Sequence, residues 1–390
     1  MGAIGIGGQG MRDMLSMMAE PGVIMTDVCD VRRSNRENAR DVVNAKYNNQ
    51  DCRAHVDFRD LLARKEIDAV VIATGDRWHA LASILAMRAG KDVYCEKPGC
   101  LGIHEGRALV ETASQTQRVF QTGAQRASES NYILAGELLR LGRLGNVHTV
   151  RAHLGYLPQW PRRNSVLPEQ PLPPRDELDW DIWLGPSPAR PYNAAFLSAY
   201  PAPGWYTQPD FAAGIAQWGS HTILQCQLAL GLGETSATEY HYPENLQREG
   251  MKIRFANGIT LVAQCSGWSG SCGVRYEGDS GWVSTADGYA RPEVSSPTLL
   301  DGARDILREY TERTGRVRNH RREFLDRIRD RKTTVTGPQV AYRTMTTNLI
   351  MDMCLDSQRN LRWDPEKEEF PDDPQANALR ARPMRAPWSL

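Results

Sequence analysis

The sequence predicts two domains: an α/β domain built on a doubly wound parallel sheet, and an α+β domain built on a large, mostly antiparallel open sheet. A chain of 390 residues is long for a single hydrophobic core. Its first third alternates short apolar runs with helical stretches of about ten residues, the pattern of a parallel sheet. Its second half carries two hairpin signals between helical stretches. We place the domains at residues 1–125 and 126–390, and we leave open that the C-terminal helix and tail pack back on the first domain.

Buried strands and amphipathic helices follow one another through the first domain. Residues 67–73 form a nearly continuous apolar run, as expected of a strand buried on both faces. The helical stretch after it closes at Gly90, a glycine suited to a C-cap. The expected strands are residues 3–7, 23–31, 67–73, 92–96 and 119–122. The expected helices are residues 11–19, 36–45, a stretch ending at 61–65, 79–89 and 105–114.

A glycine-rich turn follows the first expected strand, where Gly5, Gly7 and Gly10 match the pattern G-x-G-x-x-G. One glycine permits the tight turn, one lets a pyrophosphate approach the backbone, and one lets helix and strand pack closely. The N–H groups and the positive end of the following helix then face the phosphates. A purely structural turn is the alternative. We expect a dinucleotide to be bound by Gly5, Gly7, Gly8, Gln9, Gly10 and Met11.

A carboxylate closes the second expected strand. Asp30 stands about twenty residues beyond the turn, where an acidic residue usually binds the ribose hydroxyls. Its charge would repel a 2′-phosphate, which favours NAD as the cofactor. Arg32 and Arg33 would suit that phosphate instead, so NADP is the alternative.

The second half begins with a proline-rich stretch, residues 157–209, which cannot be regular helix or central strand. It is too aromatic to be disordered. Such an ordered loop would either present indole faces to a sugar or pack over the core. Its tryptophans are Trp160, Trp180, Trp183 and Trp205.

Hairpins and helices make up the rest of the second domain. Asn257-Gly258 and Asp279-Ser280 each separate two strand-like runs, as in a hairpin. Strands in hairpins, with helices before and after them, predict a mostly antiparallel sheet. The tail, residues 363–390, is expected to wrap the surface or a neighbouring subunit. The expected strands are residues 147–156, 252–256, 259–264, 273–277 and 281–285, and the expected helices are residues 321–331 and 339–353.

Composition excludes several classes of partner and site. The 47 Lys and Arg residues balance the 47 Asp and Glu residues, which predicts no binding to nucleic acid or anionic membranes. No apolar run is long enough to cross a bilayer. The N-terminus has no basic segment before an apolar one, so we expect a cytoplasmic protein unless an export leader has been removed. The 8 cysteines are scattered and never spaced C-x-x-C, which predicts a reducing compartment and no metal site.

The strand at residues 92–96 leads into Glu96-Lys97-Pro98. Together with the glycine turn, this element resembles the Gfo/Idh/MocA family (glucose–fructose oxidoreductase, inositol dehydrogenase and relatives). The resemblance implies a Rossmann domain, a bound nicotinamide and a carbohydrate substrate. It also implies a second domain whose open sheet often pairs subunits into homodimers or homotetramers. It spans nearly the whole chain, through residues 5–10, 73–79, 89–98, 121–126, 179–186 and 363–367.

The resemblance places Lys97 beside the nicotinamide and the reacting hydroxyl. Hydride leaves a carbinol carbon for the nicotinamide ring, while the hydroxyl proton has to go elsewhere. A lysine partly desolvated in a cleft is more easily deprotonated and can relay that proton. An exposed lysine at the end of a strand is the alternative. The resemblance also places against the cofactor Thr74, Trp78, His79 and Glu96.

The family's second element is commonly D-x-x-x-H on a helix that enters the cleft. Residues 212–221 correspond to it, with His221 on the family histidine and Gln217 where the carboxylate usually stands. Their i, i+4 spacing puts both on one helical face. Glutamine can hold a substrate hydroxyl or fix the tautomer of His221, but it cannot take a proton. Acid–base catalysis is then expected from Lys97 and His221 alone, or the reaction differs from plain dehydrogenation; a structural histidine is the alternative.

Five further residues are candidates to bind the substrate. Gln125 and Arg126 lie at the crossing between the domains, where a sugar hydroxyl could be held, although Arg126 equally suits a tie between the domains. His153, Tyr156 and Tyr206 are candidates to line the cleft, with core packing as the alternative.

Three functions remain open from the sequence. The leading hypothesis is NAD-dependent oxidation of a secondary hydroxyl on a sugar, polyol or glycoside. The second is glycoside cleavage through transient redox: a ring hydroxyl is oxidised, the ketone acidifies the neighbouring C–H, the aglycone is eliminated and hydride returns. That route predicts tightly held NAD and no net NADH. The third is a non-catalytic NAD or sugar sensor, which Gln217 favours and the presence of Lys97 and His221 opposes.

Overall fold

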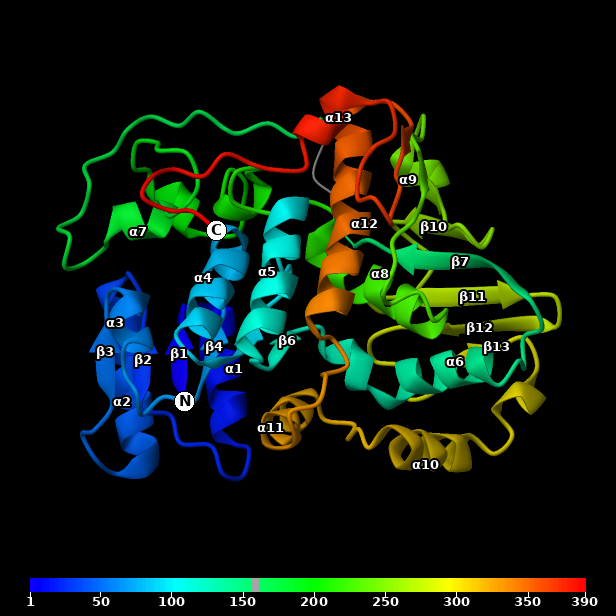
Figure 1. Cartoon of the computed structure of the whole chain (residues 1–390), viewed down its shortest axis with the longest axis horizontal. Coiled ribbons are helices and arrows are strands. Elements are labelled where there is room, and N and C mark those ends of the chain that lie inside the picture. The colour runs from blue at the N-terminus through cyan, green and yellow to red at the C-terminus, as the bar shows by residue number, and fades with distance from the viewer. Residues whose placement is uncertain (156–160) are drawn as a thin grey trace.

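The computed structural model describes residues 1–155 and 161–390. Two sheets lie toward opposite ends of an elongated molecule, and three helices run side by side between them (Figure 1): α5 (Ile103–Thr116), α12 (Pro338–Ser357) and α8 (Ala216–Ala229). Helix α12 packs against α5 on one side and against α8 on the other. Within the described ranges, no helix is both long and apolar enough to cross a membrane.

The first sheet has six parallel strands in the order β3-β2-β1-β4-β5-β6, the order of a dinucleotide-binding fold. This confirms the predicted doubly wound sheet. The strands are β1 (Gly2–Ile4), β2 (Asp27–Cys29), β3 (Arg53–His55), β4 (Ala69–Ile72), β5 (Asp92–Cys95) and β6 (Phe120–Thr122). The helices that follow them are α1 (Gly8–Met18), α2 (Arg33–Tyr47), α3 (Phe58–Leu62), α4 (Asp76–Arg88) and α5.

The second sheet has eight strands in the order β13-β12-β11-β7-β10-β9-β8-β14, and only the β7–β10 pair is parallel. The predicted, mostly antiparallel sheet is therefore confirmed. Both predicted hairpins form, β9–β10 and β11–β12. The strands are β7 (Val147–His153), β8 (Glu239–His241), β9 (Met251–Arg254), β10 (Thr260–Gln264), β11 (Val274–Gly278), β12 (Gly281–Thr285), β13 (Glu293–Val294) and β14 (Leu361–Arg362).

Helices pack on one face of this second sheet, whose strands alternate buried and exposed residues, as in β9. The other face carries charged side chains, including Arg151 and Glu277, whose side chains pair at 3.2 Å. The remaining helices of the domain are α6 (Ser130–Arg140), α7 (Trp180–Leu184), α9 (Leu246–Glu249), α10 (Ala303–Thr314), α11 (His320–Asp330) and α13 (Pro374–Ala378).

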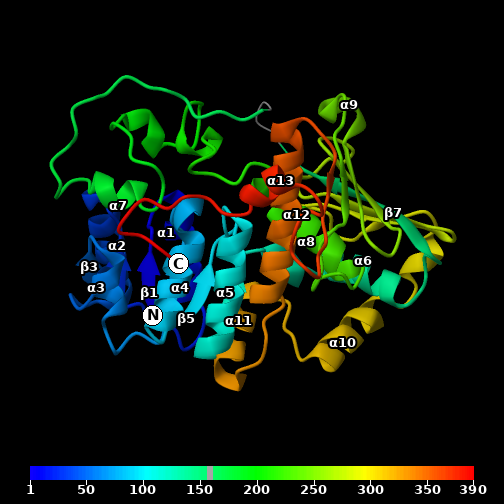
Figure 2. The same ribbon diagram turned by 45° about the horizontal axis from the view of Figure 1, so that its top comes forward.

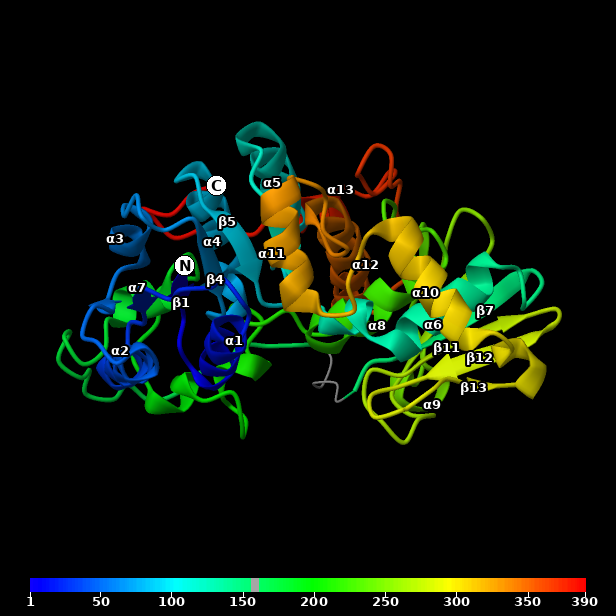
Figure 3. The same ribbon diagram turned by 90° about the horizontal axis from the view of Figure 1, so that it is seen from below.

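The sequence analysis did not predict strands β3, β8, β13 and β14 or helices α6, α7, α9, α10 and α13, and the short helix α7 lies within the proline-rich stretch, where no regular helix was expected. Strand β3 is a three-residue edge strand of sequence Arg-Ala-His, too short and polar to show an apolar run. Helix α10 is rich in charged residues and has a narrow apolar stripe, in which Ile306 is buried and Ala303 and Leu307 are partly buried. Seen from below, α11 lies at the boundary between the domains, and α10 lies on the side of the second domain (Figure 3).

The segment between α11 and α12 is attached to the last strand of the first sheet. The hydroxyls of Thr334 and Thr336 donate hydrogen bonds to the carbonyl oxygens of Phe120, at 2.7 Å, and Thr122, at 2.8 Å. Strand β6 leads directly into the crossing between the domains. These contacts therefore hold helices of the second domain on the first domain's sheet.

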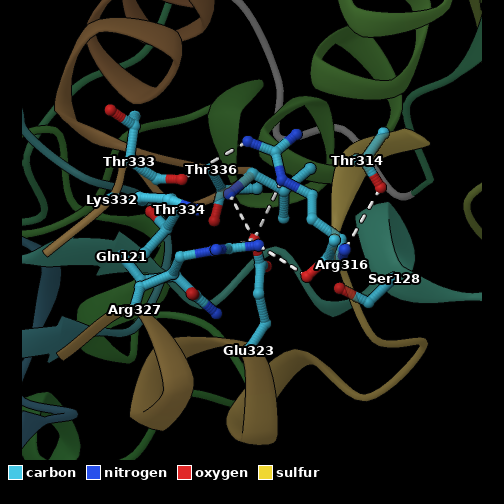
Figure 4. Close-up of polar contacts among 12 residues, drawn as sticks. Gln121, Ser128, Thr314, Arg316, Glu323, Arg327, Lys332, Thr333, Thr334 and Thr336 are labelled. Carbon is cyan, nitrogen blue, oxygen red and sulfur yellow. Dashed lines mark hydrogen bonds and ion pairs between the residues drawn. The ribbon is translucent and has the colours of Figure 1, made fainter. Parts of the chain in front are cut away.

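A buried charge cluster supports the same segment (Figure 4). Glu323 is 1% exposed and accepts the Val335 N–H at 2.9 Å. Its carboxylate lies 3.2 Å from Arg316 Nε and 3.9 Å from Arg327 Nε. A buried carboxylate with two cationic partners is costly to disrupt, because removing it leaves positive charge without compensation.

Replacing Glu323 with alanine should lower the free energy of unfolding by roughly 3 kcal/mol, since the two arginines lose their buried counter-charge. Urea unfolding would measure the change. The matched control is Glu312→Ala, whose side chain is 67% exposed beside Arg308. That variant should stay within about 0.5 kcal/mol of the wild type. Equal effects of the two substitutions would show that the cluster does not stabilise the fold.

Candidate active site

A cavity of about 660 Å³ lies at the carboxyl edge of the parallel sheet, between the two domains. Open α/β sheets bind ligands at this edge, where the strand order reverses; here that point lies between β1 and β4. Its walls come from the turns after β1, β2, β4 and β5, the domain crossing, the proline-rich stretch and α8. The predicted site residues on the walls are Gly5, Gly7, Gly8, Gln9, Asp30, Arg32, Thr74, Trp78, His79, Glu96, Lys97, Gln125, Arg126, Tyr206, Gln217 and His221.

The glycine turn forms a cradle open to the cavity. A side chain at Gly7 or Gly8 would meet nothing within 4 Å, so the backbone is free for a ligand to approach. A Cβ at Gly10 would fall 1.8 Å from the Gly5 carbonyl oxygen, so this glycine serves close helix–strand packing. These features fit a dinucleotide pyrophosphate. Gly10 does not line the cavity, and neither does Met11, which packs on a neighbouring apolar cluster.

Asp30 lies at the end of β2. Its carboxylate accepts the backbone N–H of Ile6 at 2.7 Å and that of Arg32 at 2.8 Å. Burial raises its pKa, and these two donors oppose the shift. The guanidinium of Arg33 is engaged by Asp176, whereas Arg32 stays on the cavity wall. A buried carboxylate here suits the free ribose hydroxyls of NAD better than the phosphate of NADP.

The proline-rich stretch and the C-terminal tail both cross the first domain at this end of the cavity (Figure 2). Arg32 and Leu178 form an antiparallel bridge between the stretch and the first domain. The indole N–H of Trp78 donates to the Ile182 carbonyl at 2.9 Å, and Trp388 of the tail packs edge-on against Trp78 at 4.7 Å. Trp78 therefore fastens both segments while it lines the cavity.

His79 connects two turns of the site. Its Nδ1 lies 2.6 Å from the Pro98 carbonyl and its Nε2 3.0 Å from the Thr74 carbonyl. Burial lowers the pKa of His79 to about 4, so the ring is neutral near pH 7 and donates to only one of them. The ring holds the turn after β5 close to the turn after β4.

Lys97 follows β5 and faces α8 of the other domain. Its Nζ donates to the backbone carbonyl of Gln217 at 3.2 Å. Beside it, burial raises the pKa of Glu96 to about 7. The side-chain amide of Gln125 donates to that carboxyl group at 2.8 Å. The lysine therefore stands at the meeting point of the two domains, on the wall of the cavity.

His221 is buried on α8 and also lines the cavity. Its Nδ1 has no hydrogen-bond partner among residues 1–155 and 161–390. Burial, with the positive charges of Lys97 and Arg126, lowers its pKa well below the ordinary range. The imidazole is therefore neutral near pH 7, with one nitrogen able to donate and the other able to accept.

Sequence reasoning missed Asp76, the first residue of α4, which is 2% exposed and lines the cavity. Its carboxylate accepts the Ala213 N–H at 3.0 Å and a hydrogen bond from the side-chain amide of Gln217. Burial raises the pKa of Asp76 to about 6. The available signal was a carboxylate directly after a buried strand, at the edge where such sheets bind ligands. Its partner lies 141 residues away, so no local pattern revealed the pair.

Of the other residues predicted to bind the substrate, some line the cavity and some do not. Arg126 forms a two-point ion pair with Asp287, at 3.0 and 2.7 Å, while it lines the cavity. Tyr206 is on the cavity wall. His153 is not among the lining residues: its Nε2 lies 3.1 Å from the Cys265 carbonyl. Tyr156 lies outside the described residues, as does Trp160.

Two family models cover most of the chain. Residues 1–124 match the model described as "Oxidoreductase family, NAD-binding Rossmann fold". Residues 147–390 match "Oxidoreductase family, C-terminal alpha/beta domain". The chain belongs to the Gfo/Idh/MocA oxidoreductase family. The first domain is therefore an NAD-binding Rossmann domain, and the resemblance noted in the motifs is confirmed.

Two curated relatives match about 30% of the chain. A glycosyl hydrolase family 109 protein of Shewanella baltica is 32% identical over 124 residues, which are 30% of this chain and 26% of the relative. Inositol 2-dehydrogenase 2 of Saccharopolyspora erythraea is 33% identical over 116 residues, 29% of this chain and 34% of the relative. The matches thus span 26% and 34% of the lengths of these two proteins.

Solved structures are similar over nearly the whole chain. Scyllo-inositol dehydrogenase from Lactobacillus casei, solved with NAD(H) and scyllo-inositol, has a TM-score of 0.60 at 14% identity, covering 93% of this chain and 98% of that one. The WlbA dehydrogenase from Bordetella pertussis, in complex with NADH and UDP-GlcNAcA, has a TM-score of 0.62 at 16% identity, covering 93% and 97%. At such identities the likeness shows the fold.

Asp30 should set the cofactor preference. The wild-type protein should bind NADH roughly tenfold or more tightly than NADPH, because the carboxylate would face the 2′-phosphate. Asp30→Asn should reduce the ratio of the two dissociation constants to about threefold or less. Titration of nicotinamide fluorescence measures both constants, and Asp60→Asn, an exposed acid of the same domain, is the control. A wild-type protein that binds NADPH as tightly as NADH would contradict this account.

Proposed function

We propose that the protein is an NAD-dependent dehydrogenase that oxidises a secondary hydroxyl of a sugar, polyol or glycoside. The observation that carries the proposal is the convergence of Lys97 and His221, from different domains, on the cavity that the glycine turn also lines. A hydroxyl bound between them would lie within reach of a cofactor seated on the parallel sheet.

The proposed reaction needs a hydride acceptor and a proton acceptor, and bound NAD supplies the first. The Lys97 amine, oriented by its contact with the Gln217 carbonyl, takes the proton of the substrate hydroxyl as the O–H bond breaks. His221, neutral because it is buried, donates or accepts a hydrogen bond at the same hydroxyl. The proton then passes from Lys97 to water.

The residues of the cavity wall favour a carbohydrate as the substrate. Trp205 and Tyr206 line it, and their rings lie 5.5 Å apart. Aromatic faces bind the apolar C–H surface of a pyranose or cyclitol, while Gln217 and Gln125 offer hydrogen bonds to its hydroxyls. The solved neighbours whose printed names include scyllo-inositol and UDP-GlcNAcA point to the same class of substrate.

A second candidate is glycoside cleavage through transient oxidation of a ring hydroxyl. The proline-rich stretch and the tail are attached to the first domain at Arg32 and Trp78, where the cofactor is expected to bind. This arrangement favours the second candidate, because a cofactor that returns its hydride need not leave the site. The similarity of 124 residues of the chain to a glycosyl hydrolase family 109 protein supports it as well.

The deciding experiment incubates the protein with NAD and a panel of polyols, sugars and chromogenic glycosides. Absorbance of NADH and release of aglycone are followed together. Accumulating NADH without aglycone supports the dehydrogenase, and aglycone without net NADH supports the second candidate. Absence of both signals over the whole panel would contradict both enzymatic proposals and favour the sensor.

Lys97 should be essential for turnover. Lys97→Ala should lower kcat about 10²- to 10⁴-fold, the usual contribution of a positioned proton acceptor. Binding of NADH should change little, because the glycine turn and Asp30 are untouched. Steady-state kinetics and a cofactor titration separate the two effects, with the exposed Lys65→Ala as the control. Full turnover by the Lys97 variant would refute this mechanism.

His221 should act without changing charge. Since its pKa lies well below the ordinary value, the imidazole stays unprotonated over the neutral pH range. His221→Gln should therefore reduce kcat/KM while leaving the shape of its pH profile in this range unchanged. An acid limb near pH 6.5 that is present in the wild type and absent from the variant would show instead that the histidine titrates during the reaction.

A further inference from the structure

Asp76 is a buried carboxylate on the cavity wall to which the proposed hydride transfer has so far given no role. It comes from α4 of the first domain, yet both of its hydrogen-bond donors, Ala213 and Gln217, belong to the second. The position at the start of a helix is favourable for a negative charge. Burial nevertheless opposes ionisation, so this charge needs a cationic partner.

Lys97 and the neighbouring Arg77 both supply positive charge, and Lys97 is the one linked to Asp76 through Gln217. Gln217 holds both groups: its backbone carbonyl accepts a hydrogen bond from Lys97 Nζ at 3.2 Å, and its side-chain amide donates to the Asp76 carboxylate. The positive charge of Lys97 is one of the influences that lower the pKa of Asp76 against the opposing effect of burial. The three residues therefore form one unit across the domain boundary, with the glutamine between the two charges.

We propose that Asp76 is a positioning residue for Lys97, whose carboxylate, fixed by the Gln217 amide, stabilises the lysine ammonium formed when the substrate proton is transferred. The inference rests on the proposed function for its reaction. In that reaction the O–H bond breaks, the proton goes to the Lys97 amine, and the carbinol hydrogen leaves with two electrons as hydride for NAD. In this arrangement the nucleotide domain supplies the negative charge that Gln217 on α8 lacks.

A purely structural role for Asp76 makes a different prediction. Asparagine has the same shape, and its carbonyl oxygen could still accept the hydrogen bonds from Ala213 and Gln217. If the side chain only ties the domains together, Asp76→Asn should behave like the wild type. If its charge matters, that variant should be defective although it folds normally.

Exchanging the carboxylate of residue 76 and the amide of residue 217 distinguishes a structural role of Asp76 from a role of its charge. Asp76→Asn removes the charge, and Gln217→Glu adds a second one. The double variant D76N/Q217E moves the single charge from one side of the hydrogen bond to the other while keeping one carboxylate and one amide. The other ionisable groups on the cavity wall are the same in all four proteins: Arg12, Cys29, Asp30, Arg32, Arg77, His79, Glu96, Arg126, Tyr206 and His221.

The first readout needs neither substrate nor cofactor. Acetic anhydride acylates only the uncharged amine of a lysine, so the labelling rate of Lys97, followed by peptide mass spectrometry, reports how strongly its ammonium is stabilised. The exposed Lys65 is the internal standard. At about pH 8 we expect labelling to be roughly threefold or more faster in D76N, slower in Q217E, and within about twofold of the wild type in the double variant.

The second readout is turnover, measured at alkaline pH with the best substrate of the panel. We expect kcat of D76N to fall about tenfold with little change in KM, and the double variant to recover most of it. If no substrate is turned over, the proposed function fails. The labelling rates still test whether Asp76 stabilises the ammonium form of Lys97. Unchanged labelling in D76N would overturn the inference. If D76N melts at a much lower temperature than the wild type, Q217E provides the test instead. In that case the inference would be overturned if Lys97 of Q217E were labelled no more slowly than Lys97 of the wild type.

Discussion

The burial of ionisable groups between the two domains is the constraint on which the candidate site depends. Asp76, Glu96 and His221 all lie on the wall of one cavity, and burial shifts the pKa of each toward its neutral form. Burial raises the pKa of Asp76 to about 6 and that of Glu96 to about 7, so these two groups titrate near neutral pH, whereas His221 stays neutral there. Charges there need partners that compensate them: Arg126 pairs with Asp287 at 2.7 Å, and Lys97 and Asp76 are linked through Gln217.

This constraint makes the docking of the domains part of the chemistry. Lys97 and Asp76 belong to the first domain, whereas Gln217 and His221 belong to α8 of the second. A small relative shift of the domains would separate the hydrogen bonds that Gln217 makes to both charges. The hydrogen bonds of Thr334 and Thr336 to β6, the strand that leads into the domain crossing, therefore support the geometry of the site.

Local features of the fold and site could be predicted from the sequence, because their causes lie within a few residues. The glycine turn, the hairpin at Asn257-Gly258 and the Glu96-Lys97-Pro98 element carry their own signals. Non-local features could not be predicted. Asp76 acquires its interest only through Gln217 in another domain, and the position of His153 outside the cavity follows from how β7 joins its sheet. The sequence shows that residue 217 is glutamine where the family usually has a carboxylate, but it does not show that Asp76 lies beside this glutamine.

The account's central claim is direct hydride transfer from a carbinol carbon to NAD in this cavity. The most direct test uses a turned-over sugar or polyol that carries deuterium at the carbinol carbon, followed by mass spectrometry of the nicotinamide product. The account predicts that the deuterium appears in NADH, with a slower rate for the labelled substrate. Product formed without deuterium in NADH would contradict direct transfer and would require a different reaction for this site.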